Sequence, residues 1–145
     1  MTTWTRAAVR RMRSAARVDY AADPLSGGAW RLTLPDLPPS LNDWQRWHWA
    51  RRRRQTEDLT AALMVLVRSA RIPPLRSAEA RGRCYFPDRR RRDPTNYAHW
   101  KPLWDALVRA GVLDDDDAAH LRVAAFEQLV NGARPRSEVE LRCLP

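Results

Sequence analysis

Two charged clusters form the two ends of the stretch of residues 89–117. Four arginines and an aspartate, Arg89–Asp93, begin this stretch, and four aspartates, Asp114–Asp117, end it. Lys101, which lies between the clusters, is the only lysine in the sequence. Carboxylates can hold a divalent cation, and basic side chains can hold the phosphate on which that cation acts. These residue types therefore predict a metal-dependent endonuclease that cleaves DNA.

Each cluster taken alone has a simpler interpretation. A run of four aspartates is usually a solvated acidic loop, and the spacing of an EF-hand loop is absent. Asp93 before Pro94 is also typical of a helix N-cap. A helix over residues 102–110 would be about 13 Å long. The segment from Gly111 to Asp116 can span about 20 Å, so the clusters can meet only if the chain folds back along the helix.

The composition indicates a polyanionic partner. The formal net charge is +9 over 145 residues, and the hydrophobic fraction of 44% is sufficient for a core. Nucleic acid is the simplest partner for such a chain, and an anionic membrane surface is the alternative. No apolar segment approaches the roughly 20 residues that span a bilayer, and no signal-peptide pattern is present. Cys84 and Cys143 lack the spacing of a zinc site and indicate buried, reduced thiols. We therefore expect a cytoplasmic protein that is not embedded in a membrane.

A second basic segment combines aromatic and charged side chains. Residues 43–49 contain three tryptophans and His48, and four arginines follow at Arg51–Arg54. Aromatic rings beside arginines suit stacking on unpaired bases and pairing with phosphates. The alternative is that the tryptophans pack under a helix, with the arginine stems lying across them. The sequence leaves both interpretations open.

The order of apolar patterns predicts one α/β (α+β) domain, with a mixed sheet of about four strands and two main helices packed on it. The expected strands are residues 30–34, 78–86, 121–130 and 137–144, and the last two are expected to form a hairpin. The expected helices are residues 55–70 and about 102–110, with a short turn at 95–100. Residues 1–28 are expected to be a basic N-terminal extension, helical or disordered, and residues 29–145 the folded domain.

Several motifs follow one another in a distinctive order. They are PPS-x-N at Pro38–Asn42, an arginine run ending in D-x-x-N at Asp93 and Asn96, Lys101, Asp105-Ala106-Leu107, and Ala110-Gly111-Val112 followed by the aspartates. Together they resemble the motifs of the RusA-like Holliday junction resolvases, which occur in bacteria, prophages and phages. The resemblance covers about residues 30–144. It implies a location in the bacterial nucleoid or in a phage-infected cell.

The resemblance also implies an activity and a site. The family implies a small homodimer that requires Mg²⁺, for which Mn²⁺ can substitute, and that makes paired nicks across a four-way DNA junction. Two-fold symmetry of enzyme and junction suits symmetric cutting. By motif position, Asp93 and Asp116 correspond to catalytic aspartates, and Lys101 to the catalytic lysine if two extra residues separate it from Asp93. If the motif is shifted by one residue, Asp115 or Asp117 takes the place of Asp116. The implied metal ligands are Asp93, Asp115, Asp116 and Asp117.

Thr95 departs from the family pattern D-x-D-N, because a threonine replaces the second aspartate. Asp88, Asn96 or another aspartate of the acidic run can fill its place, activity can be reduced, or the protein can bind junctions without cutting them. We expect activity to be retained, since the acidic run is longer than one ligand requires. The residues expected to contact DNA are Arg51, Arg52, Arg53, Arg54, Arg89, Arg90, Arg91, Arg92 and Asn96.

Overall fold

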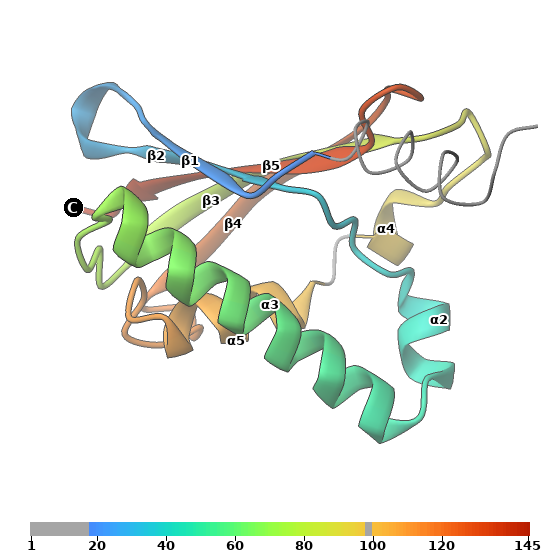
Figure 1. Ribbon diagram of the computed structural model, residues 1–145, viewed down its shortest axis with the longest axis horizontal. Coiled ribbons are helices and arrows are strands. Elements are labelled where there is room, and N and C mark those ends of the chain that lie inside the picture. Colours follow the sequence, from blue (N-terminus) through green and yellow to red (C-terminus); the bar gives the residue numbers. More distant parts are fainter. Residues whose placement is uncertain (1–17, 98–99) are drawn as a thin grey trace, which may run out of the picture.

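A five-stranded mixed sheet forms the centre of the computed structural model, which describes residues 18–97 and 100–145 (Figure 1). The strands lie in the order β1-β2-β5-β3-β4. Their bounds are β1 Ala21–Pro24, β2 Trp30–Leu34, β3 Ala78–Phe86, β4 Leu121–Val130 and β5 Arg136–Cys143. The helices are α2 Leu41–Arg46, α3 Trp49–Ala70, α4 Pro94–Tyr97 and α5 Lys101–Arg109, and a 3-10 turn, η1, covers Ser26–Gly28. The expected small α+β domain with a mixed sheet is confirmed.

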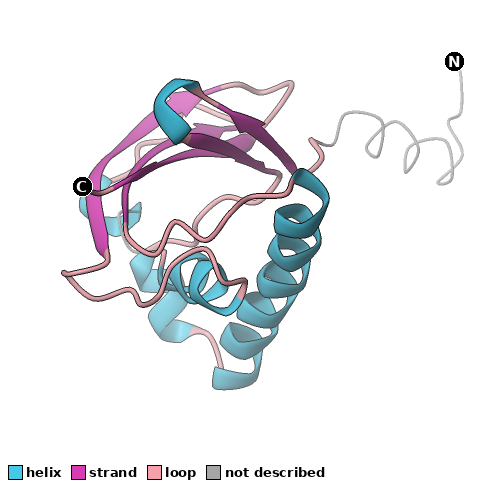
Figure 2. Ribbon diagram, turned by 90° about the vertical axis from the view of Figure 1, so that its left-hand side faces the viewer, coloured by secondary structure: helices cyan, strands magenta, loops and turns pink. Residues whose placement is uncertain are grey.

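Two helices, α3 and α5, pack against each other under one face of the sheet (Figure 2). α3 buries Leu59, Leu63 and Leu66, whose spacing places them on one side of a helix. These leucines share a single core with Leu32 of β2 and with Leu107 of α5. α3 and α5 are therefore the two main helices that the sequence predicts.

The sheet has one strand more than the expected number of about four. The additional strand, β1, lies in the segment assigned to the N-terminal extension, and it pairs antiparallel with β2 with Ala21 opposite Thr33. Val18 is buried just before it. The β1 sequence, AADP, lacks an apolar stripe and ends in proline, which a sheet tolerates at an edge. The extension therefore contributes its end to the fold, and residues 1–17 lie outside the described part of the structure.

The expected hairpin between the last two strands is wrong. β4 lies parallel to β3 at the edge of the sheet, whereas β5 lies between β2 and β3 and is antiparallel to both. The loop after β4 begins against the end of β3, where the Asn131 N–H donates to the Phe86 carbonyl at 2.9 Å. The chain then continues to the other side of β3. A parallel pair requires a crossover connection, and the segment with α4 and α5 provides it between β3 and β4.

α3 begins at Trp49 rather than at the expected Gln55. His48 caps this earlier start, because its Nδ1 accepts the Ala50 N–H at 3.2 Å. The run Arg51–Arg54 consequently lies on the first turns of the helix. At the other end Arg71 adopts a left-handed conformation with φ of 55°, which terminates the helix.

Two expectations from composition have different outcomes. Cys84 is buried and unpaired, and burial raises the pKa of its thiol to about 11. Cys143 is exposed, so the expectation of burial is wrong for this residue, which ends the final strand.

Among the described residues, no helix has the length and apolarity to cross a bilayer.

Candidate functional site

Lys101, the first residue of α5, is the centre of a cluster of charges. Its ammonium donates to a carboxylate oxygen of Asp116, and its Nζ also lies 3.1 Å from Oδ1 of Asp105. The Lys101 side chain is 60% exposed, and those of Asp105 and Asp116 are 34% and 23% exposed. Two residues predicted to act together, Lys101 and Asp116, are therefore brought into contact at an accessible surface.

The chain folds back after α5, as the contact requires. Gly111 has φ of 82°, a left-handed value that glycine adopts without strain. The Val112 N–H then donates to the Leu107 carbonyl at 3.0 Å, and both Val112 and Leu113 are buried. The Asp114 N–H donates to the Arg76 carbonyl at 2.9 Å. This anchoring on the segment before β3 fixes the acidic loop beside the start of α5.

The contact stabilises the charged forms of both partners. The Lys101 ammonium, which donates to Asp116, lowers the pKa of the Asp116 carboxyl below its ordinary value. The same hydrogen bond raises the pKa of Lys101. Lys101 therefore carries a positive charge at neutral pH and is suited to stabilise negative charge on a phosphate. It is not suited to accept a proton from water.

The other aspartates of the loop also have partners. Asp114 forms an ion pair with Arg76 at 3.3 Å, and Asp115 Oδ1 accepts the Asp116 N–H at 2.7 Å. Asp117 Oδ1 lies 2.5 Å from Nδ1 of His120, and this hydrogen bond lowers the pKa of Asp117 and raises the pKa of His120. Cations and backbone amides thus offset the repulsion expected among four adjacent carboxylates.

The cluster can bind Mg²⁺ only if further ligands from outside it complete the coordination of the ion. Within residues 18–97 and 100–145, no group of three or more His, Cys, Asp or Glu side chains is placed to hold a metal ion. Asp105 and Asp116, however, meet at the same ammonium. Mg²⁺ is commonly bound by one or two carboxylates, with water and substrate phosphates completing its coordination. The set Asp93, Asp115, Asp116 and Asp117 stays a prediction.

Asp105 belongs to this cluster, but it was not among the predicted site residues. It lies four residues after Lys101 on α5. Residues four apart on a helix face each other, so the spacing of Lys101 and Asp105 contained the signal for this pair.

Asp93 directly precedes α4, and Asn96 lies within this short helix. The Asn96 N–H donates to the Asp93 carbonyl at 3.0 Å, and Asn96 Oδ1 accepts the Asn42 N–H at 3.3 Å. Two motifs that are far apart in the sequence, residues 38–42 and 93–96, are therefore joined. The amide oxygen of Asn96 thus holds the backbone at Asn42. This positioning role was not predicted, since Asn96 was expected to contact DNA. The side chain of Thr95 lies outside the described part of the structure.

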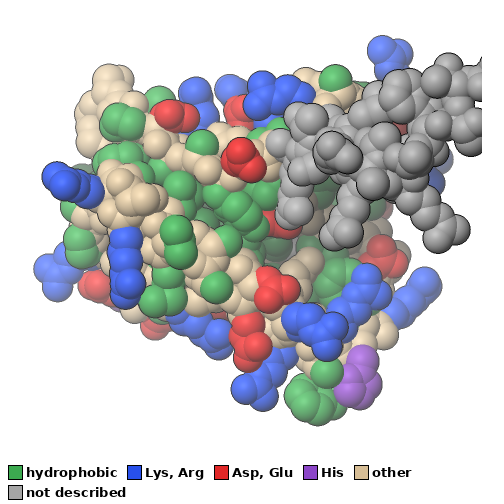
Figure 3. Space-filling view, viewed as in Figure 1, with side chains coloured by type: hydrophobic (Ala, Val, Ile, Leu, Met, Phe, Trp, Pro, Cys, Tyr) green, Lys and Arg blue, Asp and Glu red, His purple; other side chains and the backbone are tan. Residues whose placement is uncertain are grey.

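The arginines Arg51–Arg54 have distinct roles. Arg51 stacks on Trp47, with its Cζ 3.9 Å from the ring centroid, and Arg52 Nε donates to the Trp47 carbonyl at 3.1 Å. Arg53 forms an ion pair with Glu57 at 2.9 Å. Arginine side chains thus do lie across a tryptophan, but Trp49 is 64% exposed and is not part of the core. Basic side chains gather around α2 and the start of α3 (Figure 3).

The second arginine run divides into two parts. Arg92 lies on the Phe86 ring, with its Cζ 4.1 Å from the centroid, and it pairs with Asp88 at 2.7 Å. Its side chain is only 10% exposed. Arg92 therefore stabilises the end of β3 and is poorly placed to contact DNA. Arg89, Arg90 and Arg91 are exposed and remain available for phosphates.

No protein-family model matches the chain, and no curated protein matches it. The resemblance to the RusA-like resolvases therefore stays a prediction from the sequence motifs.

Proposed function

We propose that the chain is a Mg²⁺-dependent endonuclease that resolves four-way DNA junctions by paired symmetric nicks, and that it acts as a homodimer. The observation that carries the proposal is the contact of Lys101 with Asp116 and Asp105. An ammonium beside two accessible carboxylates is suited to a phosphodiester, since the carboxylates can hold a cation and the ammonium can hold the phosphate.

Each residue of the site has a distinct role in this proposal. Asp116 and Asp105 would hold Mg²⁺, with Asp93 as the further ligand that the motif predicts. When bound, Mg²⁺ supplies an activated water and neutralises charge on the phosphate. Lys101 keeps its proton and stabilises charge on the leaving oxygen. Arg89, Arg90 and Arg91 hold the flanking backbone through phosphate contacts.

The direct experiment uses a labelled four-way junction and a linear duplex of the same sequence. We expect the chain to cut the junction in Mg²⁺ at two symmetric positions, to cut the duplex far more slowly, and to be inactive in EDTA. Cleavage that persists in EDTA, or equal cutting of junction and duplex, would refute the proposal.

A catalytically silent junction-binding protein is the second candidate. It is favoured by the lack of a three-ligand metal group among the described residues and by Thr95 in place of a family aspartate. This candidate predicts binding to the junction without cutting in either Mg²⁺ or Mn²⁺. A gel-shift assay run beside the cleavage assay separates the two functions.

A further inference from the structure

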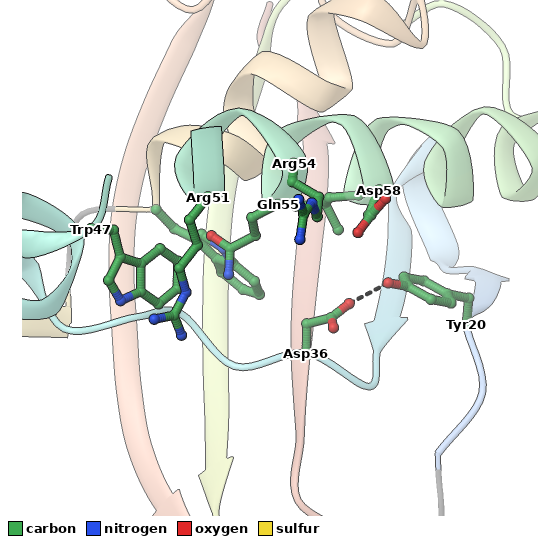
Figure 4. Close-up of a pocket in the computed structure, with 9 residues that line it drawn as sticks. Tyr20, Asp36, Trp47, Arg51, Arg54, Gln55 and Asp58 are labelled. Carbon is green, nitrogen blue, oxygen red and sulfur yellow. Dashed lines mark hydrogen bonds between the residues drawn. The ribbon is translucent and has the colours of Figure 1, made fainter. Parts of the chain in front are cut away.

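A cavity of about 330 Å³ lies between α3 and the segment that follows β2. Figure 4 shows that one face of α3 supplies most of its labelled side chains, while Asp36 and Tyr20 lie opposite. Trp100, which is 1% exposed, also lines the cavity. This volume is at the lower end of the range of about 300–1,000 Å³ that is typical of small-molecule sites.

Gln55 is an unusual residue for its position on α3. It continues the buried stripe of Leu59, Leu63 and Leu66, where an apolar side chain is expected. Its Oε1 is buried and has no hydrogen-bond partner among the described residues. A buried polar atom without a partner costs free energy, and such atoms are rare enough to need an explanation. The Gln55 side chain lines the cavity, so a ligand that donates a hydrogen bond there would satisfy this oxygen once the amide rotates toward it.

The aromatic side chains favour a flat ligand. Arg51 stacks on Trp47, and both residues line the cavity together with Trp100 and Tyr20. Unpaired nucleobases stack on aromatic rings and on arginine planes. The guanidinium of Arg51 and the partly exposed ring of Tyr20 therefore suit the faces of a base, in addition to the amide of Gln55 that suits its edge.

The charges around the cavity are balanced, which disfavours a strongly anionic ligand. Two arginines, Arg51 and Arg54, are balanced by two carboxylates, Asp36 and Asp58. Asp36 also accepts a hydrogen bond from the hydroxyl of Tyr20. A neutral base attached to a single phosphate fits this balance better than a polyphosphate does.

We propose that the cavity binds one unpaired nucleobase of DNA that bears an exocyclic amino group, with Gln55 reading its edge. Adenine fits best, because a glutamine amide can donate to N7 and accept from the N6 amino group. Trp100 directly precedes Lys101 in the chain, so the bound base would belong to a strand that runs toward the charged cluster. In that respect the inference rests on the proposed function.

The test measures binding by the full chain in EDTA, so that cleavage does not enter. Fluorescence anisotropy is used with abasic oligonucleotides of one length that carry a single adenine, a single thymine or no base. The number of phosphates is constant in this series. We expect adenine to tighten binding roughly tenfold over no base, as stacking of one base does, and thymine to tighten it less.

Gln55→Met is the informative variant, because it keeps the length of the side chain and removes its hydrogen bonding. We expect it to weaken binding of the adenine oligonucleotide by about three- to tenfold, the effect of one hydrogen bond, and to leave binding of the abasic oligonucleotide unchanged. The exposed Gln45 on α2 provides the matched control, Gln45→Met, which is expected to bind as the parent does. Thermal unfolding of both variants monitors the fold.

Equal affinity for the abasic and adenine oligonucleotides would overturn the inference, as would unchanged adenine binding by Gln55→Met. Base-dependent binding by a chain that does not cut junctions would count against the proposed nuclease alone. Junction cutting without base-dependent binding would count against the cavity alone.

Discussion

Lys101 has a position that an arginine would not fill equally well. The chain has 26 basic residues, and the single lysine among them is the one that contacts both Asp105 and Asp116. An ammonium is a compact charge, whereas a guanidinium is a planar group that binds carboxylates in a fixed geometry. The compact group can contact two carboxylates and still present a charge to a phosphate.

Replacing Lys101 by methionine should raise the pKa of Asp116. The lysine lowers that pKa by donating a hydrogen bond, and its removal also leaves Asp116 near the like charge of Asp105. The Asp116 carboxyl carbon, followed by NMR from about pH 2 to pH 7, reports the change. An unchanged pKa in Lys101→Met would show that the contact does not exist in solution.

The same pair gives a pH dependence to stability with a defined sign. The pKa of Asp116 is lowered from its ordinary 3.8, so its contribution is present above that pH and is lost as the pH falls through the lowered value. The pKa of Lys101 is raised from 10.5, so its contribution is present below that pH and is lost as the pH rises through the raised value. Urea unfolding should therefore show Lys101→Met less stable than the parent near pH 7, and the difference should vanish once the pH has fallen below the lowered pKa of Asp116. A stability difference that persists at the lowest pH would contradict the assignment.

The sequence grouped Lys101 with Asp116 in one predicted site by motif position, and their contact requires the chain to fold back after Gly111. It could not choose among four adjacent aspartates from spacing alone. The choice depends on tertiary anchors, such as the hydrogen bond from Asp114 to Arg76, which sets the register of the loop. The link from Asn96 to Asn42 likewise depends on the fold.

The pairing of β3 with β4 depends on one glycine, Gly82. Gly82 lies opposite Phe126 in the parallel register, and a Cβ at Gly82 would lie 2.3 Å from Cε1 of the Phe126 ring. That ring packs edge-on against Trp104 of α5, with centroids 5.9 Å apart. A side chain at position 82 would therefore displace the contact between the edge strand and the helix.

Gly82→Ala should destabilise the fold by about 1–3 kcal/mol, the usual cost of overpacking. In a Phe126→Ala background the same change should cost much less, because the ring that it displaces is absent. Urea unfolding of the four proteins in this double-mutant cycle measures the coupling. Additive effects of the two changes would show that the ring is not what requires glycine.

The elements that the sequence predicted well are those with a strong apolar period. The strand over residues 30–34, the strand over 78–86 and the stripe of α3 are examples, because the same side chains that form the pattern fill the core. β1 was missed because an edge strand of alanine and proline has no such pattern. The hairpin was wrong because adjacency in sequence does not reveal that β5 lies between β2 and β3.

The whole molecule combines an ordinary core with a formal net charge of +9. Exposed arginines on two segments, the first turns of α3 and the loop after β3, supply part of this charge. DNA binding that depends on phosphate contacts weakens steeply as salt rises, because counterions are released.

Changing Arg89, Arg90 and Arg91 together to glutamine should reduce the slope of log K against log salt by roughly one per arginine lost. Arg92→Gln is the control, since Arg92 stacks on Phe86 and pairs with Asp88. It should lower stability and leave the slope unchanged. Binding to a four-way junction at several salt concentrations gives both slopes, and equal slopes for the triple variant and the parent would exclude these arginines from the interface.

In the proposed function, Asp116, held by Lys101, takes part in cutting DNA. The most direct measurement is the rate of junction cleavage by Asp116→Asn beside its affinity for the same junction, with Asp114→Asn as the control because Asp114 pairs with Arg76 instead. We expect Asp116→Asn to bind the junction as the parent does and to cut it at least about a hundredfold more slowly, as expected for the loss of an electrostatic group in a site, while Asp114→Asn cuts normally. Cleavage by Asp116→Asn at the parental rate would show that Asp116 has no role in cutting.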